Sequence, residues 1–510
     1  MFVIRALVHQ ANTYVRPGDA PTDREVRTMS KKRTVLLAAA TAAACCAVLG
    51  AAPAQAAPAK GRVLRVTSTE DTGRPGTLRW ALEQSNAADG TDRIEIGKPA
   101  GIIRITSPLP VITHAVTITG AGTDRAGHPV VGIDGSSFID TSTMDSCPGW
   151  TSGSGPNVRS IHAPGLAVED SGNVTISGLT VRNFCIGLLA LRSHDDTFAG
   201  NYLANNVGAA GIEVTGDDGA GNSTTGLSVR NTVAHNTFVN NGDGMEYTRG
   251  TSDGTITDNV FEAPRDAPGG FLPSQDIEFA GDGDNGNLIA GNTFLGGFSD
   301  GLQLSGDSDV VRDNLFAHQA EAIQAGGTHQ LIEDNTLTGN HEGIVVSGAS
   351  TTLTRNEISG DGAPVSACNA GGICATDPAY PTDVLGIDRG AGGVTPDDAG
   401  DTDGIQNFPV ITTATSRNTT SVTATLASRP STRYRIEFYA DRKANPSGYG
   451  DGRTYLTSAV VTTDGKGNAK LALPTSAVRH ITADGGRVTA TATDLTTGST
   501  SEFSASVAVR

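Results

Sequence analysis

Three glutamates, Glu213, Glu246 and Glu278, recur at one position of a repeated strand pattern. If the repeats stack as parallel strands, the three carboxylates form a column with a spacing of about 4.8 Å on an outward face. Carboxylates this close repel one another, so they need water, a cation or a shared proton. Glutamine replaces glutamate in the next two repeats, at Gln303 and Gln324. The column therefore predicts acid/base groups or cation ligands that are confined to the middle repeats.

Two aspartates and two arginines flank this glutamate column. Asp243 and Asp300 directly precede candidate strands, and Arg249 and Arg192 lie where candidate strands end. We expect all four to contact a substrate, with the arginines as clamps. Carboxylates on neighbouring strands would have the short separation of a retaining glycosidase, and those on alternate strands the longer separation of an inverting one. A solvated acidic face without chemistry is the alternative.

The repeats that carry the column are longer than the others. Two of the spacings between successive Asn-x-apolar steps are 35 and 33 residues here, against about 21 in later repeats. The extra residues, roughly 216–230 and 262–275, predict loops beside the column, because insertions in solenoids gather on one face and often line a binding groove. Any function is thereby narrowed to residues 187–307.

The Asn-x-apolar step itself predicts the fold. It begins at Asn201, Asn236, Asn259, Asn292, Asn314, Asn335 and Asn356. Each repeat holds two or three short strands and cannot bury its apolar face alone, whereas stacked repeats can. We expect a right-handed parallel β-helix (a pectin-lyase-like solenoid) over residues 92–385, in which the asparagines bond to turn backbone and to the next repeat.

A solenoid end needs a cap, and residues 60–91 contain the best candidate helix, over 76–87. This segment, Pro75-Gly-Thr-Leu-Arg-Trp-Ala-Leu-Glu-Gln-Ser-Asn86, resembles a motif near the start of a family of secreted bacterial β-helix proteins. The family often continues into sequences like Leu385–Asp388 and Val394–Asp401 before a terminal β-sandwich. The resemblance covers most of residues 62–510 and implies an architecture rather than an activity.

Composition changes after the solenoid. Residues 386–407 are rich in aspartate and glycine, and residues 408–510 alternate Thr, Val and Ala in the manner of sandwich strands. Four acids of the linker could supply oxygen ligands to calcium, although a flexible linker with turns would have the same composition. They are Asp397, Asp398, Asp401 and Asp403.

The first residues have the three parts of a secretory signal. Lys31-Lys32-Arg33, an apolar run and Ala54-Gln55-Ala56 predict a signal peptide over 29–56, and residues 1–28 have the character of a non-native upstream extension. We therefore expect an extracellular protein, free or attached to the cell surface, with no membrane span after cleavage. An even number of cysteines remains, which favours disulfides in an exported chain: Cys147, Cys185, Cys368 and Cys374.

The composition excludes several function classes. A net charge of −17 argues against nucleic acid and anionic membranes as partners. No cysteine–histidine cluster indicates zinc, no motif indicates a nucleotide or redox cofactor, and no lysine lies between Lys98 and Lys443. We interpret the chain as a monomeric secreted protein that binds or processes an extracellular polysaccharide, as a polysaccharide lyase or glycoside hydrolase if it is an enzyme. A non-enzymatic adhesion or spacer protein is the alternative.

Overall fold

The computed structural model describes residues 61–88, 90–139, 164–262, 275–297, 299–362, 384–390, 392–416, 420–473 and 486–510. The predicted extension (1–28) and signal peptide (29–56) lie outside these residues, and so do Cys147, Cys368 and Cys374. In the described part of the chain, no helix is long and apolar enough to span a membrane.

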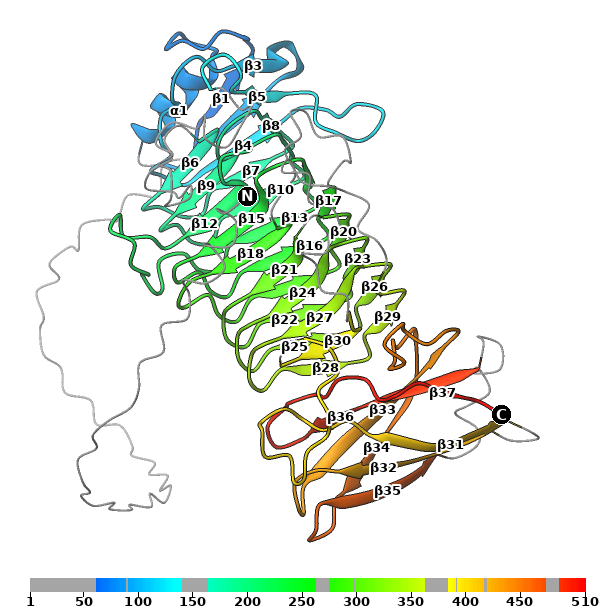
Figure 1. Cartoon of the computed structure of the whole chain (residues 1–510). Coiled ribbons are helices and arrows are strands. Elements are labelled where there is room, and N and C mark those ends of the chain that lie inside the picture. Colours follow the sequence, from blue (N-terminus) through cyan, green and yellow to red (C-terminus); the bar gives the residue numbers. More distant parts are fainter. Residues whose placement is uncertain are drawn as a thin grey trace, which may run out of the picture. The chain divides into compact units, whose positions relative to one another are not determined.

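The described residues between 63 and 389 form a parallel β-helix (Figure 1). From β7 to β29, successive strands pass through three parallel sheets in turn, so that each rung adds one strand to each sheet. Parallel crossovers of this kind are right-handed, because a twisted strand packs back onto its sheet only with that hand. The predicted fold class is confirmed for this part of the chain.

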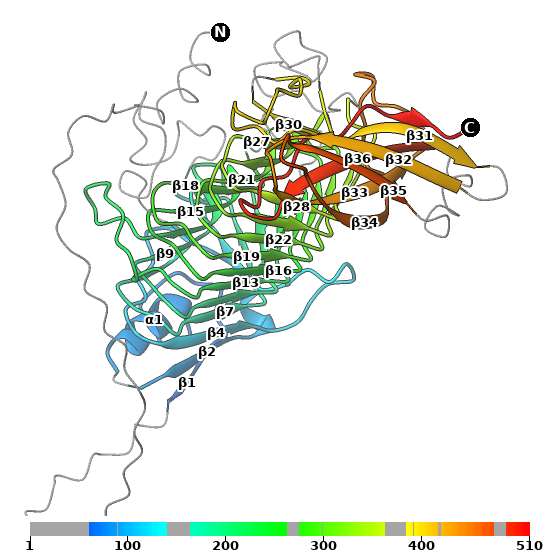
Figure 2. The same ribbon diagram turned by 90° about the horizontal axis from the view of Figure 1, so that it is seen from below.

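The strands of the three sheets are short, and those of sheet A lie side by side in Figure 2. Sheet A contains β1 (Val63–Val66), β2 (Asp92–Ile96), β4 (Val116–Gly120), β7 (Thr175–Ser177), β10 (Thr197–Ala199), β13 (Thr232–Ala234), β16 (Thr255–Thr257), β19 (Leu288–Ala290), β22 (Val310–Arg312), β25 (Leu331–Glu333) and β28 (Thr352–Thr354). Sheet B contains β3 (Ile102–Arg104), β5 (Gly132–Asp134), β8 (Thr180–Arg182), β11 (Tyr202–Ala204), β14 (Thr237–Val239), β17 (Val260–Glu262), β20 (Thr293–Leu295), β23 (Leu315–Ala317), β26 (Thr336–Thr338) and β29 (Glu357–Ser359). Sheet C contains β6 (Leu166–Glu169), β9 (Leu188–Leu191), β12 (Ala210–Thr215), β15 (Asp243–Thr248), β18 (Ile277–Ala280), β21 (Asp300–Leu304), β24 (Glu321–Ala325), β27 (Glu342–Val346) and β30 (Ile387–Arg389).

Equivalent side chains stack inside the β-helix from rung to rung. Four buried phenylalanines of sheet B lie ring over ring, with centroids 4.6, 4.9 and 4.3 Å apart. They are Phe238, Phe261, Phe294 and Phe316. The ring spacing follows the strand separation of about 4.8 Å, so each rung buries the apolar face of the next.

The repeated asparagines form a hydrogen-bonded ladder. Asn236 Nδ2 donates to Asn259 Oδ1 at 3.0 Å, and Asn259 Nδ2 donates to Asn292 Oδ1 at 3.0 Å. Each Oδ1 also accepts the backbone N–H of the preceding asparagine, and Nδ2 of Asn259 reaches the carbonyl of Val233. The predicted structural role of these residues is therefore confirmed.

The predicted helix over 76–87 is present as α1 (Leu78–Asn86), and a short 3₁₀ helix, η2 (Lys98–Ala100), follows β2. Thr77 caps the N-terminus of α1 by accepting the backbone N–H of Trp80. The buried face of α1 includes Leu78 and Leu82 and belongs to the core of the β-helix.

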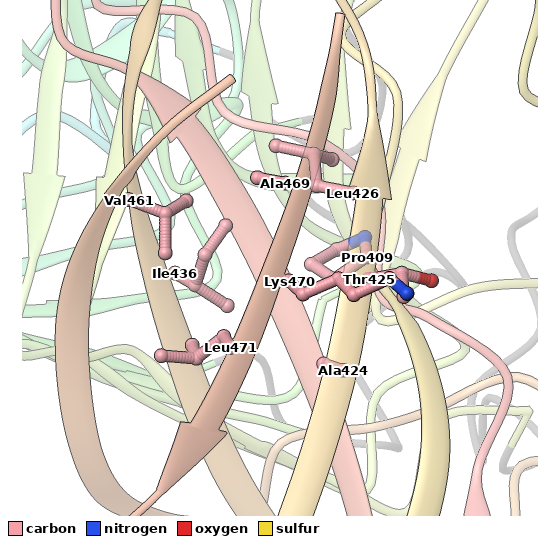
Figure 3. A pocket seen from close by; sticks show the side chains of 9 residues that line it. All are labelled: Pro409, Ala424, Thr425, Leu426, Ile436, Val461, Ala469, Lys470 and Leu471. Carbon is pink, nitrogen blue, oxygen red and sulfur yellow. The ribbon is translucent and has the colours of Figure 1, made fainter. Parts of the chain in front are cut away.

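The C-terminal residues form two antiparallel sheets, as expected of a sandwich. One contains β31 (Val410–Ser416), β32 (Thr420–Ala427) and β35 (Asn468–Leu473), and the other β34 (Thr454–Thr462), β33 (Arg433–Asp441), β36 (Arg487–Asp494) and β37 (Val507–Ala508). They share a separate apolar core that includes Val422, Ile436 and Phe438. Figure 3 shows the side chains that line a gap in this domain, among them Leu426, Ile436 and Val461. The volume of the gap is about 10 Å³, no larger than one water molecule, so it is a packing defect rather than a ligand site.

The last rung of the β-helix bonds directly to this C-terminal domain. Glu437 accepts the hydroxyl of Thr354 at 2.6 Å and the backbone N–H of Arg355 at 3.0 Å. Thr500 Oγ1 accepts the backbone N–H of Leu353 at 2.9 Å. Backbone groups at this end of the solenoid are thus paired by the following domain.

Candidate functional site

The three glutamates of the column lie on adjacent strands of sheet C. Glu213 on β12 pairs in register with Glu246 on β15, which pairs with Glu278 on β18. The register continues to Gln303 on β21 and Gln324 on β24. Figure 2 shows β15, β18 and β21 in this order. The structure therefore brings the glutamates together as the repeat pattern predicts; their role in function stays a prediction.

The column is much less exposed than a surface position would be. Glu213 is 2% exposed, and Glu246 and Glu278 are only partly exposed. Leu189 and Ala167 precede them on the same face and are also buried. The alternative of a solvated acidic face is therefore wrong for Glu213.

Burial changes the protonation of the column. It raises the pKa of Glu213 from 4.5 to about 8; Arg249 opposes this rise, and Asp217 and Glu278 add to it. Burial also raises the pKa of Glu246, to which the charges of Glu213 and Glu278 contribute, and the pKa of Glu278. Burial therefore favours the protonated form of all three carboxyls, and their titrations are linked.

One oxygen of the column has no protein partner. Glu213 Oε2 is buried and accepts no hydrogen bond from the described residues. A buried carboxyl oxygen in this state is costly unless a proton or a ligand group satisfies it. Glu278 differs, because its Oε1 accepts Gln303 Nε2 at 3.3 Å. Glu213 is therefore the member of the column best placed to gain a partner when a ligand binds.

Arg249 is the cation of the site. It follows β15, and its Nε forms an ion pair at 3.0 Å with Asp217, whose side chain is fully buried. Arg249 Nη1 donates to the carbonyl of Gly221 at 3.0 Å. The positive charge of Arg249 opposes the rise in the pKa of both Glu213 and Glu246. Two contacts fix the guanidinium, and no hydrogen bond from Nη2 to a described residue accompanies them.

Arg192 follows β9, one rung before Glu213. Its Nε and Nη2 contact the carboxylate of Asp170 at 2.6 and 2.9 Å, and its Nη1 donates to the backbone carbonyl of Asp217 at 2.5 Å. Its charge acts mainly on Asp170, which follows β6, two rungs before Glu213. The expectation that Arg192 clamps a substrate beside the glutamates therefore has less support than the same expectation for Arg249.

Asp243 and Asp300 lie beside the column at the start of their strands. The charge of Asp243 contributes to the raised pKa of Glu246. Asp300 is hydrogen-bonded to Glu321. Burial raises the pKa of Asp300 well above the usual range, and the charge of Glu321 is the next largest cause. The two aspartates thus extend the acidic site, while their predicted contact with a substrate stays a prediction.

Asp276, directly before β18, is a further buried acid on the rung of Glu278, and sequence reasoning missed it. It is buried, accepts Gln319 Nε2 at 2.9 Å, and has a pKa raised by burial to about 8. The signal was present in the sequence: the residue before the apolar position of the strand is Gly211, Gly244 or Gly301 in other rungs and aspartate here. The Asn-x-apolar repeat does not include this position, so the repeat alone does not reveal the aspartate.

The first predicted loop is present and supplies Asp217. Residues 216–224 form a turn closed by a bridge between Asp217 and Ser223. An open hollow of about 440 Å³ lies next to it, lined by residues that include Thr225, Gly250 and Asp307. Gly250, which follows Arg249 in the chain, lines this hollow, whereas Arg249 and the three glutamates are not among its lining residues. In the second predicted loop, 262–275, residues 263–274 lie outside the described residues.

The four linker acids do not all converge. Oxygens of Asp398, Asp401 and Asp403 lie within 4.8 Å of one another, which among the described residues is the one such set of three. Asp397 is not in the set and accepts the backbone N–H of Phe408 at 2.9 Å. Calcium binding in the linker stays a prediction, as does disulfide pairing, because three of the four cysteines lie outside the described residues.

A family model agrees with the fold. Residues 222–358 match the family model of the right handed beta helix region. An alginate lyase from Paenibacillus sp. is similar with a TM-score of 0.39 and 14% identity, over 59% of this chain and 97% of that one. The Dettilon tailspike protein is similar with a TM-score of 0.35 and 13% identity, over 80% and 90% of the two chains. Likenesses this distant say nothing about the reaction.

A relative of stated activity covers nearly the whole chain. The 3-dehydroshikimate dehydratase of Acinetobacter baylyi is 33% identical in an alignment of 494 positions, which covers 86% of this chain and 94% of that protein. A dehydratase is an enzyme that removes water, and it falls in the lyase class that the sequence analysis named. The chain belongs to the family of this 3-dehydroshikimate dehydratase.

Proposed function

We propose that the protein is a lyase that removes water from a small cyclic hydroxy-keto acid of the 3-dehydroshikimate type. The observation that carries the proposal is the buried column of Glu213, Glu246 and Glu278 beside Arg249, in a chain of this family. The pKa shifts, hydrogen bonds and ion pairs of the site support a role for each of these residues.

Dehydration of a β-hydroxy ketone needs a base and an acid. The base takes the proton from the carbon next to the carbonyl, and the acid protonates the hydroxyl group, which leaves as water. Stacked carboxyls that titrate as a set can offer one charged and one neutral member at the same pH. Glu246 lies between the other two, so either neighbour can exchange a proton with it through a bound substrate.

Arg249 is suited to the carboxylate of such a substrate. Guanidinium groups bind carboxylates through paired N–H donors, and Asp217 and Gly221 hold this one in place. The column carries acid/base groups while the arginine carries fixed positive charge. A substrate with a carboxylate at one end and a hydroxy ketone at the other would satisfy both.

An acidic polysaccharide is the second candidate substrate. Polysaccharide lyases also eliminate a group β to a carbonyl carbon, and the open hollow lined by Gly250 and Asp307 offers room for a chain that extends along the surface. A glycoside hydrolase would instead need two carboxyls on either side of a glycosidic bond. Burial of Glu213 supports chemistry over a spacer role. Export and a monomeric state stay part of the proposal.

The test is a direct assay of the purified full chain. We expect 3-dehydroshikimate to lose water and give an aromatic dihydroxybenzoate, followed by its ultraviolet absorbance, and we expect Glu246→Gln to lower kcat/KM by at least about 100-fold. The matched control is Glu262→Gln, since Glu262 is an exposed residue of sheet B. A second arm offers plant and microbial uronate polysaccharides and follows new double bonds.

The arms separate the candidates. Turnover of 3-dehydroshikimate alone supports the small substrate. Turnover of a polysaccharide alone would mean that the same elimination acts on the second candidate substrate. Full activity in the Glu246→Gln variant would remove the column from the mechanism, whichever substrate is used.

A further inference from the structure

A buried carboxylate without a partner lies at the end of the β-helix, remote in sequence from the glutamate column. Asp361 follows β29 and is 5% exposed. Neither of its two oxygens accepts a hydrogen bond from the described residues. An ionised carboxylate in this state is strongly destabilising unless a cation or a proton compensates it.

The charges that act on Asp361 are all negative. Burial first, and then Asp451, Glu342 and Asp441, raise its pKa well above the usual range. These three carboxylates are themselves buried. They come from both parts of the molecule, since Glu342 begins β27 and Asp441 ends β33. Among the described residues, no arginine or lysine charge acts on Asp361 beside these three acids. The four acids together form an environment that favours a cation.

The oxygens of two of these acids converge on one point. A Cβ atom built on Gly386 would lie 3.4 Å from Asp361 Oδ2 and 3.4 Å from Asp451 Oδ1. Gly386 has no side chain. Asp361 faces it from the end of the β-helix, and Asp451 faces it from the C-terminal domain. Asp451 is held in place by Asn445 Nδ2 at 3.0 Å and by the backbone N–H of Gly360 at 3.2 Å.

The acids of the linker offer a contrast. Both oxygens of Asp398 accept bonds from the backbone of Thr402, and Asp403 accepts the backbone N–H of Ile405 at 2.9 Å. Asp401 accepts the backbone N–H of Asn407 at 3.0 Å. Ordinary turn hydrogen bonds satisfy these carboxylates, whereas Asp361 has none.

We propose that Asp361 and Asp451 bind a calcium ion that joins the last rung of the β-helix to the C-terminal domain. Calcium takes six to eight oxygen ligands in flexible geometry, so backbone carbonyls and water can complete its shell, while the negative charges of Glu342 and Asp441 favour its binding. Magnesium is less suited, because it demands a near-ideal octahedron and keeps its own water. The ion compensates the buried charge and fixes the domain junction.

The test measures thermal unfolding of the full chain after dialysis against EDTA and after addition of CaCl2 or MgCl2. We expect calcium to raise the Tm by about 5 °C at a hundredfold excess over its Kd, and magnesium to have a smaller effect. Asp361→Asn should abolish the calcium-dependent shift, and the control Asp398→Asn should keep it. Because Asp361→Asn could fail to fold, Gly386→Ala is the second variant; its methyl group fills the space between the two carboxylates and should weaken the shift.

Two results would overturn the proposal. The first is a wild-type Tm that does not respond to calcium. The second is a shift that survives in Asp361→Asn or Gly386→Ala and disappears in Asp398→Asn, since this would place the ion in the linker. Activity toward 3-dehydroshikimate does not enter the readout, so the calcium site and the proposed reaction fail independently.

Discussion

Glu213 shows how its surroundings set the chemistry of a single residue. Its strand position points away from the core of the β-helix, where a carboxylate is normally hydrated and charged. Here it is buried, its pKa is raised to about 8, and one oxygen has no donor among the described residues. The residue therefore favours its neutral form in the folded protein.

This protonation predicts a pH dependence of stability. Below about pH 4.5 Glu213 is protonated in both the folded and the unfolded chain, so it contributes no penalty. Between pH 4.5 and about 8 the unfolded chain releases the proton and the folded chain keeps it, so stability falls as the pH rises through this window. We expect Glu213→Gln to raise the Tm by a few degrees at pH 8 and to change it little at pH 4.5, as measured by differential scanning calorimetry. An equal effect at both pH values would contradict this assignment.

At the scale of the strand and the rung, side-chain ladders hold the repeats in register. Asn259 illustrates this. Its Oδ1 accepts from Asn236 of the preceding rung, and its Nδ2 donates to Asn292 of the next rung and to the carbonyl of Val233. Correct register matters for function, since a slip by one residue would turn the glutamates of sheet C into the core.

Breaking the ladder predicts a loss of stability. Asn259→Ala removes the acceptor of the Asn236 N–H and the donor to Val233, which leaves buried polar groups unpaired. We expect a loss of about 3 kcal/mol, seen as a lower Tm and a lower midpoint of urea unfolding. Asn222→Ala is the control, because Asn222 is exposed and bonds only within its own turn, to Asp218. Equal effects of the two substitutions would show that the ladder is not special.

At the scale of the whole molecule, the β-helix and the C-terminal domain share hydrogen bonds. Glu437 is buried on β33, accepts two groups of the last rung and also accepts the hydroxyl of Tyr439 at 2.7 Å. An exposed solenoid end would present unpaired strand groups and promote association between chains. The domain therefore protects the end of the β-helix.

Loss of this contact should uncouple the two parts. We expect Glu437→Ala to split one calorimetric transition into two, because the groups that it bridges are left unpaired. Glu262→Ala, at an exposed position, should leave the transition of the wild type unchanged. A single transition with an unaltered Tm in Glu437→Ala would mean that other contacts couple the parts.

The repeat pattern by itself determined the architecture and much of the candidate site. Asparagine steps and alternating apolar residues can be satisfied in only one kind of stacked structure, so the β-helix, its register and the adjacency of Glu213, Glu246 and Glu278 followed from spacing. The helix over 76–87 followed from its local pattern. Such features are repeated or local, and the sequence records them directly.

Tertiary structure alone decided the electrostatics. Burial of Glu213, the contact of Arg249 with Asp217 and the pairing of Arg192 with Asp170 depend on how segments distant in sequence pack, which spacing does not reveal. The same holds for Asp361 and Asp451, which are 90 positions apart and meet only because the C-terminal domain folds against the last rung. Charge and pKa are set by the whole surrounding volume, whereas the repeat is set by neighbours along the chain.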